Sequence, residues 1–300
     1  MAAAAHAECF ELPFPDLQAL ALQEDVDANQ ALSRARTQIT AGLRDHSMPP
    51  LRLAALYAIE AQSNSILELD ADTRAAALKG LALATPNDNP VYLSLLISYA
   101  ETVYDTAGLH QQVDKMATAA ARAQSGTAAN VCLLTMLGWL QHRLNQDDLA
   151  VGTLTNAYHA SAPIALARQR ARAAEALATV MDGMGDFDQA LELIQESLSW
   201  EQGHQAQQSL SVTRYTRGTV FLEKGDPKAA LEEFAESRAL ADRLGDTQGV
   251  AYADLRTCEA NIKLGAIASG RAACNTARAA FAAAGVKDLV KQAQALLAHA

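Results

Sequence analysis

The stretch SVTRYTRGTVFLEKGDPKAALEEFAESRALADRLGD, residues 211–246, predicts two helices joined by a tight turn. Ala, Leu, Glu, Lys and Arg are frequent in it, and these residues favour helix. The letters GDP in its middle are turn signals. Gly225 can end the first helix, Asp226 can cap the second, and Pro227 fits a first helical turn. The stretch therefore predicts an antiparallel helical pair.

Small and large residues alternate between the two expected helices, 212–222 and 228–237. Gly218 and Ala230 would let the helix axes approach closely, and Phe234 would fill the gap to the next pair. Neither helix could bury its apolar face alone, so the pattern predicts further pairs stacked beside this one.

The turn recurs at a fixed step of 40 residues, and each copy is followed five positions later by a small residue. A period of this length indicates a stacked array, which typically binds partners on a long surface. The four turns are Asn145-Gln146, Gly185-Asp186, Gly225-Asp226 and Gly265-Ala266, and the small residues are Ala150, Ala190, Ala230 and Gly270.

Composition agrees with an all-α array. The chain has 300 residues, of which 50% are hydrophobic and 5% aromatic, enough for about six or seven helical pairs. The net charge is −10, and the basic triplet Arg168, Arg170 and Arg172 would spread around a helix, so we expect no nucleic-acid partner. The sequence has no apolar run of 18 residues, so we expect no membrane insertion within it.

The pattern resembles the tetratricopeptide repeat, which has Gly and Tyr in its first helix and Ala and Phe in its second. Leu137-Gly138 with Ala150 match one repeat. Ala178, Gly185-Asp186-Phe187, Ala190-Leu191 and Ile194 match the next, and Gly218, Phe221, Gly225-Asp226, Ala230-Leu231 and Phe234 match a third. The resemblance implies an all-α, right-handed α-solenoid of antiparallel helical pairs. The period exceeds the usual one of about 34 residues. We therefore expect longer helices or extended turns such as Leu244–Gly249.

Helical patterns continue on both sides of the matched region. Tyr92, Leu95, Leu96, Tyr99 and Val103 form an apolar stripe at helical spacing, followed by a helix over 109–123. Earlier helices are expected over 16–45, 51–61 and 73–83. We divide the chain into a disordered or signal-peptide segment (1–15), degenerate N-terminal repeats (16–124), tetratricopeptide-like repeats (125–285) and a C-terminal helix (286–300). The apolar face of that last helix leaves three alternatives: a removed continuation, a homodimer, or a cap.

The four cysteines, Cys9, Cys132, Cys258 and Cys274, form no C-x-x-C pair, and we expect no metal site. Cys258 and Cys274 flank the Gly265 turn at nearly equal distances. A disulfide between them is one alternative. Their offset of about half a helical turn favours the other, two buried thiols.

The sequence contains no phosphate-binding glycine loop, metalloprotease motif or nucleophile elbow. No two carboxylates pair as an acid and a base. We therefore expect no enzyme activity, no catalytic residues and no cofactor.

The resemblance implies instead that the first helices of successive repeats line a groove. Several of these side chains could equally fill space between helices. The groove would hold a protein or peptide segment. It would comprise Tyr92, Leu95, Tyr99, Cys132, Thr135, Trp139, His142, Arg172, Glu175, Thr179, Val212, Tyr215, Thr219, Tyr252, Leu255 and Glu259.

These observations predict a non-enzymatic binding module. The long period is similar to sensor arrays of bacterial regulators, such as the input region of tetratricopeptide-repeat diguanylate cyclases. Ala5-His6-Ala7 fits the small-x-small rule for a signal-peptidase site, which favours a periplasmic location. The alternative is a cytoplasmic scaffold or chaperone-like adaptor.

Overall fold

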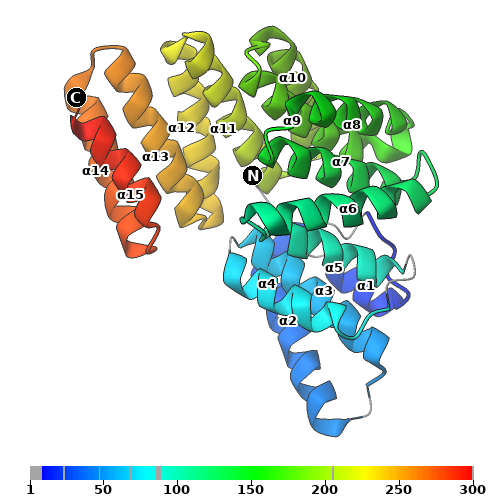
Figure 1. Cartoon of the computed structure of the whole chain (residues 1–300). Helices are drawn as coiled ribbons and strands as arrows, with labels where there is room; N and C mark the ends of the chain where they lie inside the picture. Colours follow the sequence, from blue (N-terminus) through cyan, green and yellow to red (C-terminus); the bar gives the residue numbers. More distant parts are fainter. Residues whose placement is uncertain are drawn as a thin grey trace. The chain divides into compact units, whose positions relative to one another are not determined.

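The computed structural model describes residues 9–22, 24–46, 48–67, 69–85, 89–204 and 206–298, and these confirm the expected all-α class. The expectation for residues 1–8 lies outside this range. Figure 1 shows the helices in chain order. They are α1 (Pro15–Ala21), α2 (Glu24–Asp45), α3 (Pro50–Ile66), α4 (Asp70–Leu81), α5 (Pro90–Glu101), α6 (Thr106–Arg122), α7 (Ala128–Arg143), α8 (Asp147–Ala160), the 3-10 turn η2 (Ile164–Leu166), α9 (Ala167–Gly183), α10 (Phe187–His204), α11 (Gln207–Lys224), α12 (Pro227–Leu244), α13 (Thr247–Lys263), α14 (Ile267–Ala283) and α15 (Lys287–Ala298).

The chain divides into two compact units, residues 1–180 and 181–300, and the boundary falls inside α9. Within the first unit α2 packs on α3, α3 on α4 and α4 on α5, and α7 packs on α8. Within the second unit α10 to α15 follow the same rule. Odd-numbered helices also contact one another, α3 with α5 and α5 with α7, and α11 with α13 and α13 with α15. The odd helices therefore form a continuous layer within each unit, as the first helices of stacked pairs do.

The expected turns are confirmed by their backbone. Asn145, Gly185, Gly225 and Gly265 have positive φ values of 57°, 84°, 93° and 75°. Asparagine is among the few residues besides glycine that adopt this conformation readily, which explains its place in the series. Asp226 caps α12 by accepting a hydrogen bond from the Ala229 N–H at 3.1 Å.

The long period comes from long helices. Helices α11 to α14 have 17 or 18 residues each, while α12 ends at Leu244 and α13 begins at Thr247. The extended turn expected at Leu244–Gly249 was therefore wrong. Gly245 and Gly285 also have positive φ, 73° and 76°, so the same short turn joins one pair to the next. The turn signal thus recurs every 20 residues here, at half the step found in the sequence.

Close packing within a pair occurs where the sequence predicts it. A Cβ atom at Gly218 would lie 2.6 Å from Cε1 of Phe234, whose side chain is fully buried. At Gly138 it would lie 2.5 Å from Cγ of Leu154. These glycines let a large residue of the second helix pack directly on the first helix.

All four cysteines form disulfides. Cys258 and Cys274 are joined across α13 and α14 with their Cα atoms 5.1 Å apart, so the expectation of two unpaired thiols was wrong. Gly270 explains the approach, because a Cβ there would meet the Cys258 carbonyl oxygen at 3.2 Å. The second bridge joins Cys9 to Cys132, which are 123 residues apart in the sequence.

Helix α15 covers the end of the second unit. Leu289, Val290 and Leu296 are half-buried against a cluster that contains Leu255, Phe281 and other residues of α13 and α14. The apolar face of this helix therefore packs against the preceding pair. In the described part of the chain, no helix is long and apolar enough to cross a membrane.

Candidate functional site

All sixteen candidate groove residues lie on odd-numbered helices. Leu95, Cys132 and Leu255 are buried, so their expected exposure in a groove was wrong. Val212 and the other twelve residues are half-buried. Each therefore contributes to packing and also presents a partly accessible surface. The twelve are Tyr92 and Tyr99 on α5, Thr135, Trp139 and His142 on α7, Arg172, Glu175 and Thr179 on α9, Tyr215 and Thr219 on α11, and Tyr252 and Glu259 on α13.

Two tyrosines of the second unit, on the neighbouring odd helices α11 and α13, lie in contact. The rings of Tyr215 and Tyr252 meet edge to face with centroids 6.2 Å apart. Each is also supported by a buried phenylalanine of its pair's second helix, Tyr215 by Phe234 at 5.9 Å and Tyr252 by Phe281 at 5.3 Å. This repeated contact fixes both tyrosine rings at little entropic cost, as a preformed aromatic surface requires.

A charged cluster lies on the same two helices. Arg256 donates from Nη1 to Oε2 of Glu259 at 2.8 Å and from Nη2 to Oε1 of Glu223 at 3.4 Å. Lys263 lies 3.4 Å from the other oxygen of Glu259. Burial lowers the pKa of Arg256, but Tyr215 and Glu259 more than offset this, and the net shift is upward. The cluster links α11 to α13 through a cation held between two carboxylates.

Asp182, near the end of α9, completes this cluster in the second unit. Burial and the charge of Glu223 raise its pKa, Arg256 lowers it, and the net pKa is about 6. Its Oδ1 atom is shielded from solvent and accepts no hydrogen bond within the described residues. A desolvated, partly unsatisfied carboxylate costs folding free energy, and such groups concentrate at functional sites.

Helix α9 also carries the last three candidate groove residues of the first unit. Arg172, Glu175 and Thr179 follow one another at spacings of three and four residues and share one face. Burial raises the pKa of Glu175, and Arg172 opposes the rise. The Thr179 hydroxyl donates to the Glu175 carbonyl oxygen at 3.0 Å, so it presents only its acceptor side outward.

In the first unit the predicted aromatics share one apolar cluster. Tyr92, Tyr99 and Trp139 all pack against buried residues of α5 and α7. Trp139 also lies beside His142, with ring centroids 5.6 Å apart. His142 contacts Asp147 through Nδ1 at 2.7 Å, which fixes the imidazole at the start of α8.

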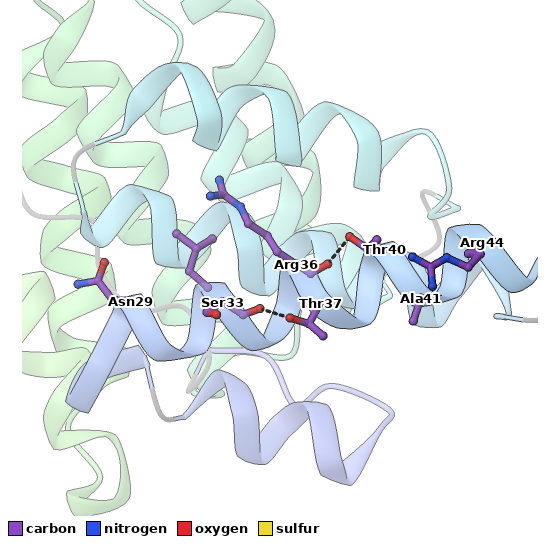
Figure 2. Close-up of a pocket in the computed structure, with 8 residues that line it drawn as sticks. Asn29, Ser33, Arg36, Thr37, Thr40, Ala41 and Arg44 are labelled. Carbon is purple, nitrogen blue, oxygen red and sulfur yellow. Dashed lines mark hydrogen bonds between the residues drawn. The ribbon is translucent and has the colours of Figure 1, made fainter.

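A separate hollow of about 660 Å³ lies along α2 (Figure 2) and includes none of the predicted residues. Its two threonine hydroxyls are already used, because Thr37 donates to the Ser33 carbonyl oxygen and Thr40 to the Arg36 carbonyl oxygen. Arg36 is paired with Glu60 at 2.8 Å. The hollow is therefore a weaker candidate than the odd-helix layer. Its lining comprises Asn29, Leu32, Ser33, Arg36, Thr37, Thr40, Ala41 and Arg44.

Sequence reasoning missed Asp182, Glu223 and Arg256. Arg256 and Glu259 have the three-residue spacing of a helical ion pair, which was a usable signal. The state of Asp182 depends on side chains of two other helices and left no local signal. Among the described residues no group of three or more His, Cys, Asp or Glu side chains could hold a metal ion.

Replacing Asp182 tests the energetic cost of this carboxylate. Because its folded pKa is raised above 3.8, the native state takes up the proton first as pH falls, and the cost is fully present only above about pH 6. Asp182→Asn should therefore raise the free energy of unfolding at pH 8. The shift corresponds to about 3 kcal/mol, and partial exposure reduces the expected gain to about 1–2 kcal/mol.

Urea unfolding at pH 8 and pH 4 measures the effect, and the gain should disappear at pH 4. Glu236→Gln, which removes an exposed carboxylate of α12, is the control and should change little at either pH. Destabilisation by Asp182→Asn at pH 8 would contradict the assignment.

Comparison with known proteins places the fold. The sequence matches no known protein family and no curated protein. Among solved structures, a Rap protein complexed with competence and sporulation factor is 13% identical with a TM-score of 0.71, over 92% of this chain and 78% of that one. Aspartyl phosphate phosphatase F from Bacillus subtilis is 14% identical with a TM-score of 0.58, over 93% and 77%.

The TPR-like repeats of a putative kinesin light chain from Podosopora anserina are 14% identical with a TM-score of 0.54, over 65% of this chain and 96% of that one. At these identities the likeness concerns the fold alone. The chain therefore has a tetratricopeptide-like, all-α fold of helices packed in sequential pairs.

Proposed function

We propose that the odd-helix layer binds an extended segment of a peptide or protein. The observation that carries the proposal is the joint placement of Tyr215, Tyr252 and the Asp182–Arg256 cluster on the inner helices of the second unit. Preformed aromatic rings supply contact area, and charged groups beside them fix the orientation of a ligand. The buried carboxylate of Asp182 also lowers folding stability, and such a residue is expected at a binding site rather than in packing.

We propose a non-enzymatic role for this surface. One structural neighbour is a phosphatase by name, but at 14% identity only its fold is shared. The carboxyl pKa of Asp182 is raised to about 6, and its charged neighbours Glu223 and Arg256 form an ion pair across helices. This arrangement suits recognition of a charged ligand group.

Peptide selection tests the proposal without knowledge of the natural partner. A random displayed peptide library is enriched on the immobilised full chain. The enriched peptides are then measured against Tyr215→Ala/Tyr252→Ala and against Trp200→Ala. Trp200 is the matched control because it lies on α10, an even helix, and stacks on His204 at 4.4 Å. Equal binding to wild type and the tyrosine double variant would refute the proposal.

We further propose that this surface is the sensing part of a bacterial signalling protein outside the cytoplasm. The two disulfides support an oxidising compartment. The cytoplasmic scaffold is the alternative, and the cysteines distinguish the two.

Protein isolated from its native host without reductant, denatured and treated with a thiol reagent, should show no reactive cysteine. After reduction, all four should react. A cytoplasmic protein would instead show reactive thiols before reductant is added, because cellular reductants keep its cysteines reduced. Four thiols without added reductant would refute the periplasmic proposal and leave the binding proposal untouched.

A further inference from the structure

The segment that precedes α1 is buried although it belongs to no helix. Cys9 is 4% exposed, Phe10 3% and Leu12 6%, whereas Glu11 and Pro13 are exposed. Residues 9 and 10 form a turn and a bend, and residues 11–12 follow without regular structure, so a non-helical segment lies on an apolar surface. The Leu12 N–H donates to Oε1 of Gln18 on α1 at 2.7 Å, which fixes the point where the segment leaves that surface.

The surface under Cys9 and Phe10 is an apolar cluster formed by α5, α6 and α7 of the first unit. Cys9 is joined to Cys132 on α7, a residue of the predicted groove. Positions at steps of 40 residues from Cys132 are Tyr92, Arg172, Val212 and Tyr252, and all four are half-buried. Cys132 alone in this series is buried, with 8% exposure. The disulfide places Cys9 directly against this position.

Phe10 packs where a ligand side chain would pack. It belongs to the same apolar cluster as the buried residues Ile97 and Leu133, against which Tyr92, Tyr99 and Trp139 are placed. These three aromatics were predicted as groove residues from the repeat register. A non-helical segment with an inserted aromatic ring is the kind of ligand that such a groove would take.

We infer that residues 9–12 are an internal ligand, which fills the peptide-binding surface of the first unit while the Cys9–Cys132 disulfide is closed. The inference rests on the proposed function and specifies its ligand: a non-helical segment whose aromatic side chain enters the apolar cluster that contains Ile97 and Leu133. The occupied first-unit surface would then bind external peptides of this pattern only after the segment is released.

Release starts with reduction of the bridge. A dithiol reductant supplies two electrons and two protons, the Sγ–Sγ bond breaks, Cys9 and Cys132 become thiols, and the reductant becomes a disulfide. Among the described contacts, the segment is then held by the packing of Phe10 and Leu12, by the hydrogen bond from the Leu12 N–H to Gln18, and by its connection to α1. Because that connection keeps it at high effective concentration, release is complete only when its packing is weakened too.

The probe is a fluorescent peptide of residues 9–14 with serine in place of cysteine. It is titrated against the oxidised full chain and against the full-chain variant Cys9→Ser/Phe10→Ala. Binding to the variant should be at least tenfold tighter. Cys258→Ser/Cys274→Ser, which removes the other bridge and keeps the segment, should behave as the oxidised wild type. Equal affinity for wild type and variant, or no binding to a variant with unchanged helix content, would overturn the inference.

Cys9→Ser alone keeps the packing side chains and provides a second readout. Chymotrypsin cleavage after Phe10 should be at least fivefold faster in this variant than in the oxidised wild type, and an unchanged rate would overturn the inference. Failure of the general proposal is distinguishable: there, library peptides would bind independently of Tyr215 and Tyr252. Failure of this inference alone leaves that dependence intact while the probe peptide does not bind.

Discussion

Gly218→Leu is expected to lower the free energy of unfolding by about 2 kcal/mol. Overpacking a close contact costs about 1–3 kcal/mol, and leucine returns up to about 0.8 kcal/mol through its better helix propensity. The upper end of the cost applies because the added Cβ would lie 2.6 Å from a phenylalanine ring that is fully buried and has no space to move. Helices α11 and α12 would have to separate.

Thr219→Leu is the matched control, one residue further along the same helix. Thr219 is half-buried on the odd helix α11, and its hydroxyl donates to the Tyr215 carbonyl oxygen of the same helix at 3.1 Å. The change should shift stability by about 0.5 kcal/mol or less. Urea unfolding followed by circular dichroism compares the two. Equal losses would show that the helical register of the repeat is wrong.

Tyr215→Ala/Tyr252→Ala should weaken binding of a selected peptide by about 2 kcal/mol or more, roughly 30-fold. Both rings are already oriented by Phe234 and Phe281, so the wild type loses little entropy when a ligand covers them. Trp200→Ala should change affinity by less than about threefold, because the stacked Trp200 lies on an even helix.

Isothermal titration with one enriched peptide gives both values, and circular dichroism confirms that helix content is kept. Trp139→Ala should show a comparable loss, but only in protein whose N-terminal segment has been released, since Phe10 shares its cluster. If Trp200→Ala abolished binding while the tyrosine variant kept it, the even helices would be the binding surface.

The sequence was sufficient to predict the helical pairs because their signals are local. Each signal lies within six consecutive residues of the chain. At one turn they are the positive-φ residue Gly225, the aspartate cap Asp226 and the small residue Ala230. The link between pairs was missed at first, because Gly245 was assigned to a longer turn. Helix length decides that question, and it depends on stacking against neighbours rather than on residues near the turn.

The candidate site was only partly predictable for the same reason. The repeat register placed Tyr215 and Tyr252 on inner helices, but the raised pKa of Asp182 arises from burial and from Glu223 on another helix. The Cys9–Cys132 bridge joins residues 123 apart, and no local pattern encodes that contact. Even the Cys258–Cys274 bridge required the close approach at Gly270, which shortens the distance between two helices.

Photo-crosslinking tests most directly whether the odd-helix layer is the binding surface. A benzophenone side chain replaces Thr219 of the odd-helix layer. In the control protein it replaces Glu236 on the exposed face of α12. Each protein is irradiated with a selected peptide, and the crosslinked fraction is measured by mass spectrometry. We expect efficient crosslinking from position 219 and background levels from position 236. Crosslinking from position 236 with none from position 219 would contradict it.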